Sequence, residues 1–181
     1  MPIIPIVTVP DPVLNKKCQK IEEFDDETKK LGKDLVETLL NAKNPEGAGL
    51  AAPQIGILKR VIVVRKFMSN PLDPYKELSQ EFILFNPEVI SHSPDKETDW
   101  EGCLSIPDTY GKVERPKKVK VKAQNQNGEE ITLNASGFFS RVIQHEIDHL
   151  DGILFTDKTV GKVLNEEQLD KLYEDYSRIA A

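Results

Sequence analysis

The stretch Gln144-His145-Glu146-Ile147-Asp148-His149 holds two histidines four residues apart, with a glutamate directly after the first. On an α-helix this spacing is about one turn, so that His145 and His149 project from the same face. Two imidazoles arranged in this way can hold one metal ion, and Glu146 is then near enough to handle a proton of an attacking water. The sequence therefore predicts a central helix that carries a metal site for hydrolysis.

An ordinary amphipathic helix is the simpler interpretation of the same stretch. The chain has only 3 histidines, however, and two of them lie in this motif. Phe138, Val142, His145 and His149 follow one another at helical spacing on one face. That face is first apolar and then carries imidazoles, as expected for a helix that lines a pocket and then a metal. Arg141 lies close to this face, and we interpret it as solvated, with a place at the edge of the pocket as the alternative.

The remaining pattern indicates an α+β fold. Helices are expected from Asp25 or Asp26 to about Lys43, around the histidine motif, and from Asn165 onward. The first of these would bury Leu31, Leu35, Leu39 and Leu40. Strands are expected over about residues 60–65, 82–90, 118–123 and 130–135, the last two joined by a hairpin at Asn127-Gly128. We therefore expect short, mainly antiparallel sheets packed around the metal-binding helix, with a C-terminal helix.

The length of 181 residues suits one domain or slightly more. With the hydrolytic motif described above, we expect a single catalytic domain over residues 1–181. The net charge of −6 gives no general attraction to nucleic acid or to anionic membranes, so neither DNA nor a membrane is an expected partner. No apolar run approaches the roughly 20 residues of a spanning helix, and no secretory signal is recognisable. The 2 cysteines are too few for a disulfide scaffold. These features predict a cytoplasmic, reducing location.

A catalytic metal usually takes three protein ligands, so that the two histidines need a partner. Cys103, within Trp100-Glu101-Gly102-Cys103-Leu104-Ser105, is the best candidate, because Gly102 allows the backbone to approach closely. A lone cysteine is more often a small buried apolar residue, which is how we interpret Cys18.

The segment Gly47 to Gly56 is rich in glycine and alanine, so that its backbone is exposed. It lacks the Lys-Ser/Thr ending of a phosphate-binding loop and the full dinucleotide fingerprint. One interpretation is a packed turn in which side chains must be small. The other is a strip whose amide groups pair with an extended peptide, with Gln54 reaching into the site.

Three motifs together resemble the peptide deformylase family. They are GAGLAAPQ (47–54), EGCLS (101–105) and QHEIDHL (144–150), in this order and at this spacing. The resemblance implies a hydrolase that removes the N-formyl group from the initiator methionine of new polypeptides and releases formate. It implies that Cys103, His145 and His149 bind one divalent metal, usually ferrous iron, which zinc, nickel or cobalt can replace. It also implies that Glu146 is the general base and acid.

The same resemblance assigns oxyanion stabilisation to Gln54 and to the backbone N–H of Leu104. Phe138 and Val142 are expected to wall a pocket for the methionine side chain. The N-formylmethionyl nascent peptide would lie extended between Gly47–Gly49 and the strand that holds Gly102.

The sequence does not decide which residues hold the two imidazoles in place. Asp148 or Gln144 could hold an imidazole in place, or both could be surface residues of the helix. A transient ribosome contact could use Lys118, Lys120 and Lys122, although a solvated strand face is the better interpretation of these lysines.

Two other functions compete with a deformylase. A zinc endopeptidase could use the same histidine motif, with a downstream carboxylate as its third ligand. A protein with a structural zinc would need four ligands, for which Cys18 and His92 are the spare candidates.

Overall fold

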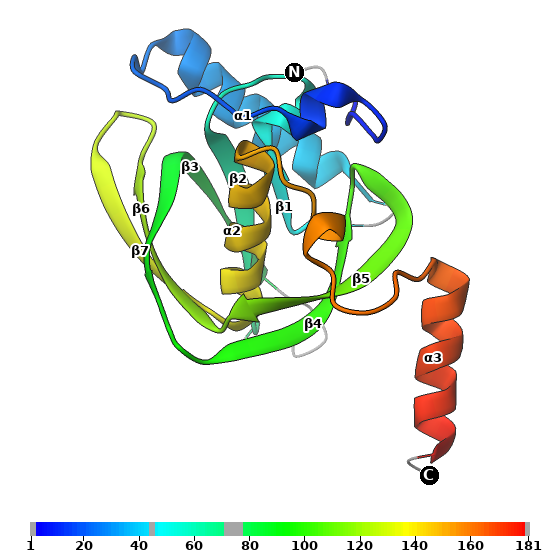
Figure 1. Ribbon diagram of the computed structural model, residues 1–181. Coiled ribbons are helices and arrows are strands. Elements are labelled where there is room, and N and C mark those ends of the chain that lie inside the picture. Colours follow the sequence, from blue (N-terminus) through cyan, green and yellow to red (C-terminus); the bar gives the residue numbers. More distant parts are fainter. Residues whose placement is uncertain (1–2, 44–45, 71–77, 180–181) are drawn as a thin grey trace.

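Helix α2 (Gly137–Leu150) stands at the centre of the molecule, with the strands of one sheet on one side of it and a long β-hairpin on the other (Figure 1). The computed structural model describes residues 3–43, 46–70 and 78–179. The other helices are α1 (Asp26–Asn41) and α3 (Glu166–Ile179), with short 3₁₀ turns at η1 (Pro12–Asn15), η2 (Ala52–Ile55) and η3 (Phe155–Lys158). The strands are β1 (Gly49–Ala51), β2 (Val61–Met68), β3 (Leu78–His92), β4 (Lys96–Cys103), β5 (Ile106–Pro116), β6 (Lys118–Gln124) and β7 (Glu130–Ser136).

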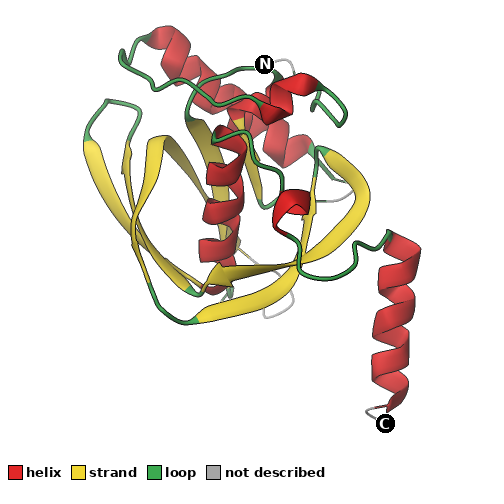
Figure 2. Ribbon diagram, in the orientation of Figure 1, coloured by secondary structure: helices red, strands yellow, loops and turns green. Residues whose placement is uncertain are grey.

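All strand pairs within the two sheets are antiparallel. The larger sheet has the order β1-β2-β3-β6-β7, and β4 and β5 form a second, two-stranded sheet (Figure 2). The short strand β1 is an edge of the larger sheet, and β4 belongs to the separate hairpin. The expected α+β fold of antiparallel sheets around a central helix, with a helix at the C-terminal end, is confirmed.

Alternation of apolar and polar residues explains how the sheet packs on α2. Val119, Val121 and Ala123 of β6 are buried, whereas the lysines between them are exposed. This period of two matches the pleat of a strand with one solvated face. Ile143 and Leu150 of α2 join the same core cluster. The predicted strands at 118–123 and 130–135 are confirmed, and their turn contains Gly128 at φ 80°.

Helix α1 covers a second core cluster and largely follows the prediction. Asp25 caps it, because its Oδ1 accepts a hydrogen bond of 2.8 Å from the Thr28 N–H. Leu31, Leu35 and Leu39 are buried as expected. The prediction for Leu40 is wrong: it is 45% exposed, since it follows Leu39 directly and faces away from the sheet.

The last helix begins at the predicted cap. The Asn165 side chain accepts a hydrogen bond from the Gln168 N–H, and the Gln168 side chain accepts one from the Asn165 N–H. Helix α3 extends away from the rest of the molecule (Figure 1). Its first turn is attached to the hairpin, because the Glu166 N–H donates to Asp108 Oδ1 at 2.7 Å. Among the described residues, no helix is long and apolar enough to cross a membrane.

Candidate metal centre and active site

Cys103, His145 and His149 come together at the end of β4 and on the inner face of α2. Their ligand atoms all lie within 4.8 Å of one another. Cys103 Sγ lies 3.2 Å from His149 Nε2. His145 and His149 are buried, and Cys103 is half-buried. The three residues that the sequence picked out therefore converge at one point.

An irregularity in the hairpin delivers the cysteine to this point. The pairing of β4 with β5 is regular up to Gly102 opposite Tyr110, and it then shifts so that Cys103 faces Ile106. Such a shift turns the strand and redirects its side chains. Here it allows the sulfur of Cys103 to face the two imidazoles of α2.

Glu101 holds the His145 ring from behind. Its Oε2 lies 3.0 Å from His145 Nδ1, and its two oxygens accept hydrogen bonds from Arg115 at 2.6 and 2.9 Å. Arg141 donates to the same carboxylate at 2.7 Å. Burial acts to raise the pKa of Glu101, but the hydrogen bonds from Arg115 and His145 hold that pKa far below its usual range. Glu101 is therefore an ionised, fully paired carboxylate that fixes the orientation of a candidate ligand.

Two predictions about neighbouring residues need correction. Arg141 was interpreted as solvated, but it is only 6% exposed. It lines the cavity, as in the alternative interpretation, because the buried Glu101 carboxylate draws its guanidinium inward. Among the described residues, neither Asp148 nor Gln144 bonds to an imidazole: Asp148 pairs with Arg115 and Lys158, and Gln144 donates to Pro116 O.

The Glu146 carboxylate lies beside the cluster in a nearly closed environment. The residue is 4% exposed, and its Oε2 has no hydrogen-bond partner among the described residues. Burial raises the pKa of Glu146 to about 7, although the neighbouring His145 works in the opposite direction. A buried carboxyl with a free oxygen and a pKa near neutrality is suited to accepting and returning a proton.

Gln54 reaches into the same space from η2. It is 1% exposed, and its Nε2 lies 3.6 Å from Cys103 Sγ and 3.1 Å from Ser105 Oγ. Its Oε1 accepts a hydrogen bond of 2.7 Å from the Ala51 N–H. The amide is thereby oriented with its NH₂ group toward the cluster, as the sequence interpretation expected of Gln54.

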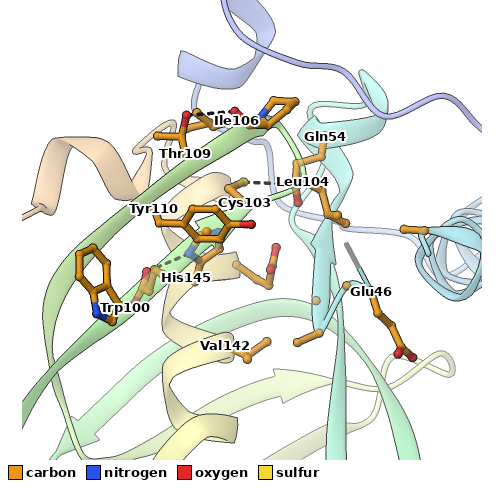
Figure 3. Close-up of a pocket in the computed structure, with 18 of the residues that line it drawn as sticks. Glu46, Gln54, Trp100, Cys103, Leu104, Ile106, Thr109, Tyr110, Val142 and His145 are labelled. Carbon is orange, nitrogen blue, oxygen red and sulfur yellow. Dashed lines mark hydrogen bonds and ion pairs between the residues drawn. The ribbon is translucent and has the colours of Figure 1, made fainter. Parts of the chain in front are cut away.

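A cavity of about 740 Å³ opens in front of the cluster (Figure 3). The residues that the sequence assigned to peptide binding all line it: Gly47, Gly49, Gly102, Phe138 and Val142. Leu104 lines it as well. Val142 is buried in the wall, whereas Phe138 is 58% exposed and packs against the Phe67 ring, with centroids 6.2 Å apart.

The glycines of the cavity wall permit close contacts. A Cβ at Gly49 would lie 2.5 Å from Glu146 Oε1, and one at Gly47 would lie 2.6 Å from Leu39. A Cβ at Gly102 would lie 2.9 Å from the Tyr110 ring. Each of these distances is shorter than a side chain can tolerate, which confirms that the 47–56 segment is tightly packed. The segment also lines the cavity, and its pairing with an extended peptide stays a prediction.

The spare ligand candidates lie elsewhere. Cys18 is 5% exposed and belongs to a core cluster, as predicted, and burial raises its pKa to about 11. His92 is exposed, with its Nδ1 3.0 Å from Ser93 O. Within the described residues, neither joins the Cys103 cluster, so no fourth protein ligand closes the site.

The donor set fits a divalent metal. One sulfur and two imidazole nitrogens within 4.8 Å can share an ion at bond lengths of about 2.0–2.3 Å. His149 Nδ1 is buried without a partner among the described residues, whereas His145 Nδ1 is held by Glu101. Three protein ligands and an adjacent free carboxylate oxygen are the arrangement of a catalytic rather than a structural site.

The two cysteines give a direct test of this assignment. With metal bound, we expect a thiol reagent at pH 8 to modify neither cysteine, because Cys103 is a ligand and Cys18 is buried. After chelation, one thiol per chain should react, and mass spectrometry should locate it at Cys103. Both should react in denaturant. Equal labelling of Cys103 with and without metal would contradict its role as a ligand.

Comparison with known proteins places the chain in a family. A family model described as polypeptide deformylase matches residues 3–164. Peptide deformylase 2 of Clostridium acetobutylicum is 46% identical over 147 residues, which cover 81% of this chain and 89% of the relative. Peptide deformylase of Natranaerobius thermophilus is 44% identical over 170 residues, covering 93% of this chain and 99% of the relative.

Solved structures agree with this result. The peptide deformylase of Thermotoga maritima superimposes with a TM-score of 0.76 at 35% identity, over 89% of this chain and 100% of that one. The peptide deformylase of Acinetobacter baumannii, solved with Met-Ala-Ser bound, superimposes with a TM-score of 0.76 at 34% identity, over 86% of this chain and 98% of that one. The chain belongs to the polypeptide deformylase family.

Proposed function

We propose that the protein is a metal-dependent hydrolase that removes the N-formyl group from the N-terminal formylmethionine of newly made polypeptides, with release of formate. The observation that carries this proposal is the Cys103–His145–His149 cluster with the free Glu146 carboxylate beside it, at the bottom of a cavity, in a chain of the deformylase family.

The proposed metal ligands are Cys103, His145 and His149. A bound divalent ion would polarise the formyl carbonyl and lower the pKa of water, which is the chemistry that a poorly electrophilic amide needs. We propose ferrous iron as the physiological ion, with zinc, nickel or cobalt able to replace it. Thiolate and imidazole ligands are compatible with each of these metals.

Three residues are proposed to transfer the proton and to stabilise the developing negative charge. Glu146 would accept the proton of the attacking water and return it to the departing amine, for which a pKa of about 7 is suitable. The Gln54 NH₂ group, held in place through Ala51 and Ser105, would donate to the oxyanion, together with the Leu104 N–H. A fixed donor of this kind contributes about 2.7–4 kcal/mol to the transition state.

The peptide is proposed to bind between two strand edges. Strand β1, with Gly49, and strand β4, with Gly102, both line the cavity. Main-chain pairing with these edges would hold an extended peptide without selecting many side chains. Phe138 and Val142 would contact the methionine. The Acinetobacter baumannii enzyme was solved with a tripeptide that begins with methionine, which supports this class of substrate.

The most direct test of the function is release of formate from formyl-Met-Ala-Ser by protein reconstituted without oxygen with ferrous iron or nickel. We expect rapid release that requires the formyl group and the metal. Cleavage of internal bonds in unformylated peptides would instead favour an endopeptidase. Tightly held metal with neither activity would favour a structural metal site.

Replacement of Gly49 by alanine tests the fit of the cavity wall. The added Cβ would meet Glu146 Oε1 at 2.5 Å, so that either the carboxylate or β1 must move. Because misplacement of a reacting group by about 1 Å can lower the reaction rate roughly 100-fold, we expect kcat to fall by about that factor.

The matched control is Gly32→Ala, whose Cβ would meet Ile83 at 2.9 Å in the core behind α1. It should lower the Tm but leave kcat nearly unchanged. Equal kcat values for the two variants would contradict the account.

Two broader assignments, the location and the domain organisation, belong to the proposal. The two free cysteines, one of them a proposed ligand, support a reducing location, the cytoplasm. We treat residues 1–181 as one catalytic domain, since Glu166 at the start of α3 is bonded to Asp108 and lines the same cavity.

A transient ribosome contact through Lys118, Lys120 and Lys122 remains a hypothesis. All three are exposed on β6, and Lys122 pairs with Glu130. Reversal of the three charges should weaken co-sedimentation with ribosomes. Unchanged co-sedimentation would exclude this surface.

A further inference from the structure

Arg65 is a buried cation on β2 that has no part in the chemistry proposed above. It follows the buried residues Val61 and Val63 at alternate positions of the strand, and it is only 9% exposed. A buried arginine needs partners for its charge. Two carboxylates supply them: Glu46 Oε1 lies 2.6 Å from Arg65 Nη1, and Glu81 Oε1 lies 3.6 Å from Arg65 Nε. Arg65 itself does not line the cavity, but several of its contacts do.

One group of these contacts holds the segment that forms a wall of the cavity. The backbone N–H of Arg65 donates to Ala48 O at 2.8 Å, and its Nη1 donates to Gly47 O at 3.2 Å. The same Nη1 donates to Glu46 Oε1. Glu46, Gly47 and Ala48 all line the cavity, and Glu46 extends at its edge (Figure 3). Because β1 begins only at Gly49, Arg65 attaches three residues that precede the strand.

The other group of contacts supports the aromatic residue that is proposed to meet the methionine. The Cζ atom of Arg65 lies 4.9 Å from the centre of the Phe67 ring. The Phe67 ring in turn lies against Phe138, with centroids 6.2 Å apart, and Phe138 lines the cavity. A guanidinium over the face of an aromatic ring is attracted to it. Phe67 is therefore held between Arg65 and Phe138.

Strand β3 fixes the orientation of the guanidinium. Arg65 Nη2 donates to Ser79 Oγ at 3.1 Å, and Ser79 Oγ donates to Glu81 Oε1 at 2.9 Å. In the pairing of β2 with β3, Glu81 is opposite Arg65 and Ser79 is opposite Phe67. A planar guanidinium can bond several acceptors at once, which the ammonium group of a lysine does less well. The contacts of Arg65 thus connect both parts of the cavity wall to the paired strands β2 and β3.

We infer that Arg65 is a positioning residue that holds the Glu46–Ala48 segment and Phe138 at the separation that a methionine side chain requires, without touching the substrate. This inference rests on the proposed deformylase function. Within the described residues, the guanidinium bonds to none of the proposed metal ligands, and it bonds to neither Glu146 nor Gln54. Its removal therefore loosens the pocket for the first residue and leaves the reacting groups in place.

The first test compares KM and kcat of the wild type and Arg65→Met for formyl-Met-Ala-Ser. Methionine retains an apolar chain but removes the charge and every donor of the side chain. We expect KM to rise about tenfold while kcat stays within about twofold. The preference for formyl-Met-Ala-Ser over formyl-Ala-Ala-Ser should fall by a similar factor, because an alanine does not reach the loosened walls. Unchanged KM, or a fall in kcat alone, would overturn the inference.

Arg65→Lys separates positioning from stability. It retains the positive charge between Glu46 and Glu81, so that it should recover most of the Tm that Arg65→Met loses. It cannot reproduce the bonds to Glu46, Gly47 and Ser79 together, so that KM should remain raised. Recovery of the wild-type KM by lysine would show that only the charge matters, and it would contradict the positioning role.

The two carboxylates beside Arg65 provide a matched pair of variants. Glu46→Ala removes a contact with the cavity wall and should raise KM about fivefold, whereas Glu81→Ala removes a contact with β3 and should lower the Tm with little effect on KM. In the background of Arg65→Met, Glu46→Ala should have no further effect, since it acts through the arginine. Glu46 is exposed, so this variant decides the question even where Arg65→Met does not fold. Equal KM values for Glu46→Ala and Glu81→Ala, or additive effects of Glu46→Ala and Arg65→Met, would overturn the inference.

A binding measurement does not need turnover. Calorimetric titration of the metal-loaded protein with Met-Ala-Ser should give a Kd about tenfold higher for Arg65→Met than for the wild type, and a wild-type Kd for Glu81→Ala. The same Kd for Arg65→Met and the wild type would overturn the inference. Weaker binding by Arg65→Met, with no release of formate by either protein, would contradict the proposed function but support the role of Arg65.

Discussion

Replacement of Glu146 by alanine should reduce kcat for formate release by about 100- to 10,000-fold and leave the metal content unchanged. The carboxylate lies beside the Cys103–His145–His149 cluster but is not part of it, and one of its oxygens is free within the described structure. Its removal therefore eliminates the group that carries the proton without removing a ligand. Metal analysis of the purified variant, alongside kcat, separates these two effects.

A matched control distinguishes the loss of the proposed base from the loss of a negative charge elsewhere on the protein. Glu130→Ala removes an exposed carboxylate that forms an ion pair with Lys122 on the neighbouring strand. Exposed pairs of this kind contribute less than about 1 kcal/mol, and this one lies on the sheet, outside the cavity. We expect the Glu130→Ala variant to retain the kcat and the metal content of the wild type. Loss of metal from the Glu146 variant would mean that Glu146 is a ligand and not the base.

Replacement of Glu101 by glutamine should weaken both the metal site and the fold. The carboxylate fixes His145 and pairs with Arg115 and Arg141, all of which are buried. Loss of an outer partner of a ligating histidine lowers metal affinity by roughly 10- to 100-fold. Removal of one partner from a buried ion pair costs about 3–5 kcal/mol, because a charge is left without compensation. Competition with a chelator measures the first effect, and denaturant unfolding measures the second.

The matched control for Glu101 is Glu114→Gln on the adjacent strand. Glu114 pairs with Lys96, and both side chains are about half exposed, at 49% and 54%. The same change of charge should therefore alter neither metal affinity nor the free energy of unfolding by more than about 1 kcal/mol. If Glu101→Gln retained wild-type metal affinity, the orientation of His145 would not depend on this carboxylate.

The sequence identified the residues that the structure brings together at the candidate site, because each lies in a local pattern. The helical spacing of His145 and His149 identifies one face, and the family motifs around Cys103 and Gln54 add the remaining positions. The two strands at 118–123 and 130–135 were predictable for the same reason, since each shows a clean alternation. Leu40 was wrongly predicted to be buried because the spacing of apolar residues does not define the edge of a buried helix face to within one residue. Packing against the rest of the fold decides whether a leucine at that edge is buried.

The charged residues around the site could not be predicted from local pattern. Arg115 reaches Glu101 and Asp148 across 14 and 33 residues of sequence, and Arg141 reaches Glu101 across 40. A buried charge is stable only when partners of this kind surround it, and no spacing rule reveals them. The long hairpin of β4 and β5 escaped a full prediction for a related reason: β4 is mostly exposed, so its residues lack an apolar alternation.

The decisive measurement is an anaerobic titration of metal-free protein with ferrous iron, in which formate release from formyl-Met-Ala-Ser and bound metal are followed together. We predict that turnover is absent in the metal-free protein, rises in proportion to bound iron and reaches its maximum at one ion per chain. Cys103→Ala should bind iron more weakly in the same assay. Turnover by the metal-free protein, or full loading with iron without release of formate, would contradict the account.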